Sequence, residues 1–164
     1  MEPAKIVGSG VVYVLEAVIG RSDVIRTVAD DLPGAVFIPL TQDIAMVPMT
    51  DALIASAGPD VTADQDLGFS KLPAGFEHKL SGWSSRGPVG YVEAEFFGGV
   101  GTQQAALWTA GRLSLGPISV DEGQPGSPIS ELLRHLGVDR GDHYDEFEAV
   151  GLDRHRWTDE WQQD

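Results

Sequence analysis

The sequence predicts one α+β domain, with a mainly antiparallel sheet of about five or six strands and helices packed on one face of that sheet. Three observations lead to this prediction. Short runs rich in β-branched and aromatic residues recur along the chain, glycine-containing turns join the central runs as hairpins, and segments with helical spacing lie on either side of them. The chain has 164 residues, so we expect a single domain over residues 1–164.

The composition limits the partners that the chain can have. It carries 25 Asp and Glu residues against 11 Lys and Arg residues, a formal net charge of −14. Such a surface repels phosphate backbones, which argues against nucleic-acid binding. It attracts a basic protein partner, although a need for solubility alone also explains the charge. Cysteine is absent, which excludes disulfides and thiolate chemistry. No run approaches the length of a membrane helix and no signal peptide opens the chain, so a soluble cytoplasmic protein is expected.

The first part of the chain carries a strand signal and then a helix signal. Residues 5–19 are dominated by valine and other β-branched or aromatic types, which predicts a long strand. Ser22 and Asp23 form a helix-capping pair, and apolar residues at helical spacing follow them as far as Pro33-Gly34. The pattern predicts an amphipathic helix after the first strand.

Two short apolar runs, residues 35–40 and 44–48, predict a hairpin. Proline at Pro39 and Pro48 places these strands at edges or ends of the sheet. Thr50 can then cap a short helix that runs to Ala57.

Residues 58–70 are polar and carry Asp60, Asp64 and Asp66, which predicts a mobile acidic loop. The loop lacks the residue pattern of a calcium-binding loop. Residues 73–83 then predict a helix opened by proline.

The glycine-rich stretch at residues 98–102 resembles a phosphate-binding loop but lacks its chemistry. Gly101 is followed by Thr102 and Gln103 with no lysine, and the dinucleotide fingerprint has Gln104 where its third glycine belongs. A hairpin agrees better with the pattern. A four-residue loop over residues 98–101 pairs Val92 with Leu107 and gives one apolar face.

A second hairpin is predicted at a three-residue loop, Thr109-Ala110-Gly111, which pairs Trp108 with Arg112. The face opposite the predicted core then carries Tyr91, Glu93 and Glu95. The two glutamates point the same way, about 6 to 7 Å apart. This spacing suits acid–base chemistry or the binding of a hydrated cation. The alternative is a solvated face of the sheet, on which Arg112 lies over Trp108 and faces the two glutamates. The exposed aromatic rings also resemble a binding patch.

The C-terminal part contains the clearest helix signal and a basic cluster. Ser127-Pro128 is typical of a helix start, and Gly137 of a helix end. A short helix is predicted over residues 144–150. Residues 154–157, namely Arg154, His155, Arg156 and Trp157, can hold an anion or can pair with nearby acids and fix the tail at residues 151–164 with its tryptophans.

No metal or cofactor is predicted. The histidines lack the spacing of metal ligands, and no serine lies in a nucleophile elbow. Asp142, His143 and Asp145 form the nearest approach to a cation site.

The segments PVGYVEAEFFGGVGTQQAALW (88–108), GLDRHRWTDEW (151–161) and TDALIASA (50–57) resemble an uncharacterised family of small acidic bacterial proteins. By size, acidity and lack of cysteine the chain also resembles bacterial immunity proteins, which neutralise toxins.

The leading hypothesis is therefore a non-enzymatic protein-binding domain of the immunity or inhibitor kind with a basic partner. The alternative is a small enzyme or ligand-binding domain that uses Glu93, Glu95 and Arg112 with residues 154–157. Assembly of identical copies through an edge strand is also compatible with the sequence.

Overall fold

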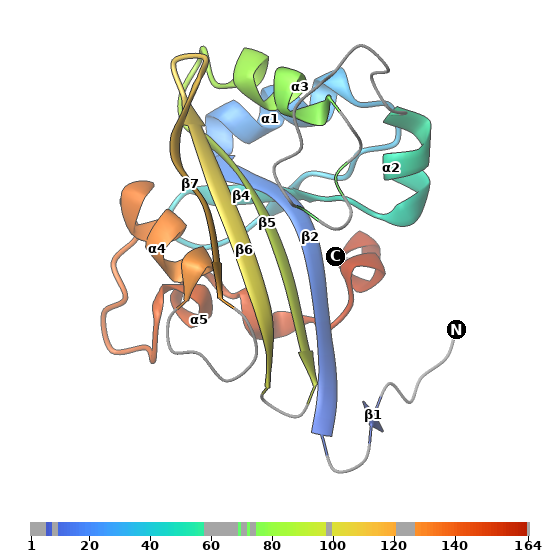
Figure 1. Ribbon diagram of the computed structural model, residues 1–164, viewed down its shortest axis with the longest axis vertical. Helices are drawn as coiled ribbons and strands as arrows, with labels where there is room; N and C mark the ends of the chain where they lie inside the picture. The colour runs from blue at the N-terminus through green and yellow to red at the C-terminus, as the bar shows by residue number, and fades with distance from the viewer. Residues whose placement is uncertain are drawn as a thin grey trace.

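The computed structural model describes residues 6–7, 10–57, 69, 72, 75–97, 100–120 and 127–163. Its strands form an antiparallel sheet in the order β3-β4-β2-β5-β6-β7, and β1 pairs with β2 (Figure 1). The strands are β1 (Ile6–Val7), β2 (Gly10–Arg21), β3 (Ile38–Pro39), β4 (Ile44–Pro48), β5 (Val89–Phe97), β6 (Val100–Thr109) and β7 (Arg112–Val120). The predicted α+β class with an antiparallel sheet is confirmed. The predicted mobile loop, residues 58–70, lies outside the described residues except for Phe69.

Thr50 and Ser127 cap helices as predicted. The predicted capping pair Ser22-Asp23 instead lies inside the first helix, whose N-cap is Arg21 with no side-chain hydrogen bond, and the helix expected to open at Pro73 begins at Phe76. The helices themselves lie in the predicted parts of the chain. They are α1 (Ser22–Asp31), α2 (Asp51–Ala57), α3 (Phe76–Trp83), α4 (Pro128–His135) and α5 (Glu146–Val150), with 3₁₀ helices η1 (Leu152–Arg154) and η2 (Thr158–Gln163). The Ser127 hydroxyl accepts a hydrogen bond from the backbone N–H of Ser130 at the start of α4, and Pro128 is its first residue. Within the part of the chain that is described, no helix is long and apolar enough to span a membrane.

Helices cover both faces of the sheet, so the prediction of helices on one face is wrong. One core lies between the sheet and α1, α2 and α3, and the other between the sheet and α4, α5 and the two 3₁₀ helices. The reason is that β2 is apolar on both sides. Ile19 packs into the second of these cores and its neighbour Val18 into the first, because adjacent side chains of a strand point to opposite faces. Each face therefore needs its own cover.

The two central hairpins form, with registers that differ from the predicted ones. Phe97 pairs with Val100, so Val92 lies opposite Ala105 rather than Leu107. A shift of two residues leaves each side chain on its predicted face, since the period of a strand is two. In the second hairpin Thr109 pairs with Arg112, which leaves a two-residue turn.

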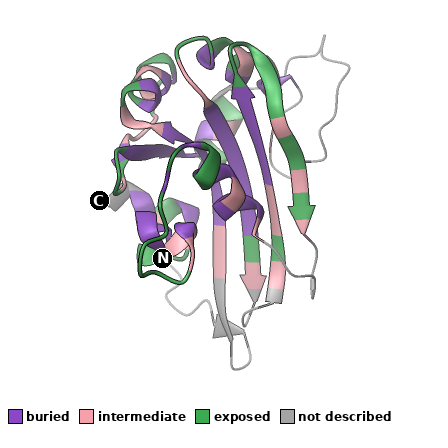
Figure 2. Ribbon diagram, turned by 90° about the vertical axis from the view of Figure 1, so that its left-hand side faces the viewer, coloured by how far each residue is buried: buried purple, intermediate pink, exposed green. Residues whose placement is uncertain are grey.

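Ala110 and Gly111 at this turn have φ values of 52° and 82°. This left-handed pair is typical of two-residue hairpin turns, because its twist matches that of the flanking strands. Further along β7 the pairing shifts between Ala105 and Trp108 of β6. Such irregular pairing and the proline at Pro117 make the exposed edge strand β7 a poor partner for another strand. Figure 2 shows this strand in green and pink beside the buried middle of the sheet.

The C-terminal segment covers part of the β2 edge that β4 leaves open. β4 pairs only with Ala17 to Arg21. Before that point, the N–H of Val14 donates to the carbonyl of Arg156 at 2.7 Å, and the N–H of Glu16 donates to the hydroxyl of Thr158 at 3.2 Å. These bonds satisfy buried backbone groups that would otherwise lack a partner. Trp161 lies fully buried in the adjoining core.

A close approach of α4 to the sheet depends on Gly90 in β5. A Cβ atom at this position would lie 2.7 Å from Cδ1 of Leu132. We expect Gly90→Ala to lower the free energy of unfolding by about 1 to 3 kcal/mol through overpacking, and Leu132→Ala to lower it by about 2 to 5 kcal/mol.

Because Leu132→Ala removes the atoms that the added methyl group would meet, the double variant should lose at least about 1 kcal/mol less than the sum of the two single losses. Urea unfolding of the four proteins measures this coupling. If the two losses of unfolding free energy were additive, the predicted close contact between Leu132 of α4 and Gly90 would be contradicted.

Candidate functional site

The aromatic residues predicted as exposed binding anchors are buried. Tyr91 and Trp108 belong to the core beneath α1 and α3, and the ring of Tyr91 meets that of Phe69 edge-on with centroids 4.9 Å apart. The prediction treated this face of β5 and β6 as solvated because only one face was assigned to the core. Since helices cover this face too, these rings stabilise the fold and are not available to a partner.

The two predicted glutamates share a face but differ in environment. Glu95 is exposed, whereas Glu93 is 7% exposed and accepts a hydrogen bond of 2.8 Å from the hydroxyl of Tyr91. In register with Glu93, on the neighbouring strand β2, lies Glu16, which is 6% exposed. Directly opposed residues of antiparallel strands have Cβ atoms about 4.5 to 5.5 Å apart, so two largely buried carboxyl groups lie side by side.

Glu16 was missed by the sequence analysis. The signal is present, because it is the one charged residue in the run Val11 to Gly20 of a strand that is otherwise apolar on both faces. Burying a carboxylate is costly without hydrogen bonds, and one is provided by the hydroxyl of Thr158 at 3.3 Å from Oε1. The same hydroxyl accepts from the N–H of Glu16, so η2 positions this side chain.

A cavity of about 250 Å³ opens beside these carboxylates. It lies where the start of α2, the strands β2 and β5, and η2 meet, and we call it the acidic cavity. Its described lining residues are Val14, Glu16, Thr50, Asp51, Glu95, Trp157, Thr158 and Asp159. All four ionisable residues among them are acidic, and they come from four separate elements or their ends. The cavity thus joins Glu95 and Trp157 of the predicted site to three acids that were not in it.

Arg112 does not lie with the glutamates. It pairs with Thr109 at the end of β6, whereas Glu93 pairs with Gln104. Five positions along a strand correspond to about 16 Å. Trp108 is buried and opposite Leu113, so the predicted stacking of Arg112 over it is replaced by core packing.

The basic cluster is directed mainly into the fold. The guanidinium of Arg154 donates to the carbonyl of Pro39 at 3.2 Å and lies over the Trp161 ring. The His155 ring meets the Trp161 ring edge-on, with centroids 4.7 Å apart. Arg156 is exposed, and its backbone N–H donates to Oε1 of Glu160 at 2.8 Å. Of these four residues, only Trp157 lines the acidic cavity.

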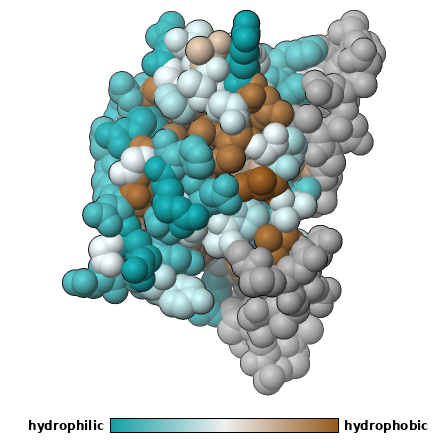
Figure 3. All heavy atoms as spheres, turned by 60° about the vertical axis from the view of Figure 1, so that its left-hand side comes forward, coloured by the Kyte–Doolittle hydropathy of each residue, from teal (hydrophilic) through white to brown (hydrophobic). Residues whose placement is uncertain are grey.

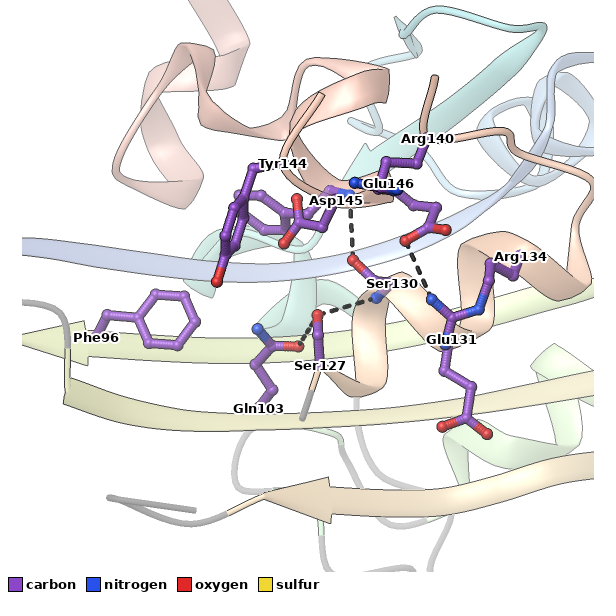
Figure 4. Close-up of a pocket in the computed structure, with 11 residues that line it drawn as sticks. Phe96, Gln103, Ser127, Ser130, Glu131, Arg134, Arg140, Tyr144, Asp145 and Glu146 are labelled. Carbon is purple, nitrogen blue, oxygen red and sulfur yellow. Dashed lines mark hydrogen bonds and ion pairs between the residues drawn. The ribbon is translucent and has the colours of Figure 1, made fainter. Parts of the chain in front are cut away.

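A larger cavity of about 760 Å³ lies on the opposite face of the sheet, between α4 and the segment that leads into α5 (Figure 4). We call it the α4–α5 cavity. It is lined by aromatic residues Phe96, Tyr144 and Phe147, by polar residues Gln103, Ser127 and Ser130, and by charged residues Glu131, Arg134, Arg140, Asp145 and Glu146. Its volume is within the range of small-ligand pockets, roughly 300 to 1,000 Å³, whereas the acidic cavity is smaller and suits a single side chain.

Neither cavity has the ligand arrangement of a metal centre. Among the described residues, no three His, Asp or Glu side chains are grouped so that they could hold a metal ion. Asp142, His143 and Asp145, the nearest approach to a cation site in the sequence, do not form such a group either. Nδ1 of His143 instead lies 3.3 Å from Oε1 of Glu148. No family model, curated protein or solved structure matches the chain.

Two tyrosines, the buried Tyr91 and the half-buried Tyr13, bind their protons strongly. Burial, and then the charge and hydrogen bond of Glu93, raise the pKa of Tyr91 well above its ordinary value, and the charge of Glu16 adds to this effect. Burial, and then the charge of Asp153, raise the pKa of Tyr13, whose hydroxyl donates to the carbonyl of Leu152 at 2.8 Å. Both groups stay protonated in the folded state at a pH where unfolded tyrosine has ionised.

We therefore expect alkaline destabilisation. The contribution of each tyrosine is fully present below its unfolded pKa, about 10, and is lost as the pH rises above it, because the unfolded chain then binds fewer protons. The free energy of unfolding should fall by up to about 1.4 kcal/mol per pH unit for each tyrosine. Urea unfolding between about pH 8 and pH 11.5 measures this slope.

Tyr91→Phe and Tyr13→Phe should each make the alkaline slope shallower. Tyr144→Phe is the matched control, because its ring is 84% exposed, and it should keep the wild-type slope. Equal slopes in Tyr91→Phe and Tyr144→Phe would contradict the assigned role of the buried hydroxyl.

Proposed function

We propose that this protein is a non-enzymatic binding domain of the immunity or inhibitor kind, which receives a cationic side chain of a basic protein partner in the acidic cavity. The observation that carries the proposal is the convergence of four carboxyl groups and an indole ring on one cavity with the volume of a side chain. Lysine and arginine are the side chains that such a lining favours, because carboxylates attract the charge and an indole face adds a cation–π contact.

The positions of the acids support a prepared site. Glu16 is held by Thr158 and lies deep in the cavity wall, while Glu95, Asp51 and Asp159 are exposed around it. Glu16 is only 6% exposed, and water screens charges least in such a place, so a cation from a partner would be attracted most strongly next to Glu16. The exposed acids would attract the partner from a distance and set its rate of association.

The net charge of the whole chain supports the same partner. At −14, the molecule produces a field that raises the association rate of a basic protein by about 10- to 1,000-fold at low ionic strength.

The alternative, a small enzyme that uses Glu93 and Glu95 with Arg112, has less support. Arg112 lies about 16 Å along the sheet from Glu93, and Arg154 is engaged with Pro39 and Trp161. The carboxyl groups remain, but neither Arg112 nor Arg154 lines the cavity that holds Glu16 and Glu95.

A short fluorescent peptide with four arginines separated by glycines provides the test. Its dissociation constant is measured by anisotropy at several salt concentrations. We expect Glu95→Gln with Asp159→Asn to weaken binding about tenfold at low salt, because two of the cavity charges are lost. Trp157→Leu should weaken it by several-fold through the lost cation–π contact.

The matched control is Asp30→Asn with Asp142→Asn, which removes the same charge from two exposed positions outside the acidic cavity. This control should change the dissociation constant by less than about twofold. Equal weakening by the two double variants would show that the peptide binds to the general negative field, and the acidic cavity would lose its proposed role.

A further inference from the structure

The α4–α5 cavity has an aromatic end. Tyr144, on the segment before α5, is 84% exposed and is one of two large hydrophobic residues that are exposed among the described residues. Figure 4 shows its hydroxyl end pointing toward the ring of Phe96 from β5, so the two rings border the same space. Figure 3, which looks onto the side with α4 and β7, shows a mostly hydrophilic surface with separate hydrophobic areas. An exposed ring at the mouth of a cavity suits contact with an apolar ligand group.

The polar middle of the cavity is held in place by hydrogen bonds. Oε1 of Gln103 accepts from the N–H of Ile129 at 3.0 Å and from the hydroxyl of Ser127 at 3.3 Å. With the carbonyl oxygen engaged by the start of α4, the amide nitrogen of Gln103 lies on the side of Phe96 and can donate into the cavity (Figure 4). A donor that is fixed before binding loses little entropy when a ligand arrives.

Charges of both signs complete the lining. Arg134 uses one guanidinium nitrogen to bind Oε1 of Glu146 at 3.1 Å, and its side chain remains 55% exposed. Arg140 is exposed and donates to the carbonyl of His143 at 3.3 Å. The carboxylate of Asp145 accepts the N–H of Glu148 through Oδ1 and points into the cavity (Figure 4). The cavity therefore offers donors for a carboxylate and an acceptor for an ammonium group.

From this arrangement we infer that the α4–α5 cavity binds a zwitterionic aromatic amino acid. The ring lies against Tyr144 and Phe96, the carboxylate faces Arg134 and Arg140, and the ammonium group faces Asp145. A zwitterion matches the lining better than an anion does, since the described lining has two basic and three acidic residues. It is also neutral overall, so the net charge of −14 does not repel it. This site is separate from the acidic cavity and does not depend on the function proposed for it.

Titration with L-phenylalanine, followed by ¹H–¹⁵N NMR, tests the inference. Saturable shifts are expected at the amides of residues 127, 129–131 and 140–147, with a dissociation constant in the millimolar range or below, as is usual for a ligand of this size. Phenylpropionate lacks the ammonium group, phenethylamine lacks the carboxylate and L-alanine lacks the ring. Each should bind at least about tenfold more weakly, because each leaves one of the three contacts unmade.

Two variants at exposed positions locate the site without disturbing the core. Tyr144→Ala and Arg140→Gln should each weaken L-phenylalanine binding by about fivefold or more, since each removes one contact. The matched controls are Leu113→Ala and Arg112→Gln, which truncate an exposed apolar and an exposed basic residue outside the cavity, and they should leave the dissociation constant unchanged.

Three results would each overturn the inference. The first is the absence of saturable shifts with L-phenylalanine. The second is equal binding of phenylpropionate or phenethylamine, which would remove the zwitterion from the recognition. The third is unchanged binding in both cavity variants when their thermal unfolding matches that of the wild type.

Discussion

The burial of β2 on both faces is the constraint on which the rest of the structure depends. This strand pairs with β5 along most of its length and with β4 only along its second half. Because Ile19 and Val18 point to opposite sides and are both fully buried, two separate helical layers are needed. Part of the edge that β4 does not cover, around Val14 and Glu16, is bonded by the C-terminal segment. The backbone bonds of Val14 and Glu16 to that segment explain why the tail belongs to the core.

The same constraint places the acidic cavity. After β4 stops pairing with β2, the chain continues into α2, and η2 from the C-terminal segment lies nearby. The cavity lies beside β2, where β4, α2 and η2 separate from one another. Polar side chains are tolerated there because hydroxyl groups and solvent lie within reach of them. Glu16 is the deepest of these residues, and its bond to Thr158 links the charge in the sheet to the packing of the tail. The position of the Glu16 carboxyl group and the position of the C-terminal segment therefore depend on each other.

The end of β5 contributes to both cavities. Glu95 faces the acidic cavity and its neighbour Phe96 faces the α4–α5 cavity, because consecutive side chains of a strand alternate between faces. The two openings consequently lie on opposite sides of the sheet and differ in size and chemistry. A molecule bound in one of them would not block the other. The domain in this way has two cavities of different chemistry on a single set of strands.

The sequence by itself determined the features that depend on neighbouring residues. Ser127-Pro128 specified the start of α4, Gly111 specified a left-handed turn, and alternation assigned every side chain of β5 to its side of the sheet even though the hairpin register was two residues off. Only the tertiary structure decided which helices cover each face of the sheet. That β2 lies beside β5, with Glu16 opposite Glu93, joins residues 77 positions apart. Local patterns carry no information about such pairing, because the free energy that selects it comes from packing among distant segments. For that reason Tyr91 and Trp108, which a one-sided sheet would expose, became part of a second core.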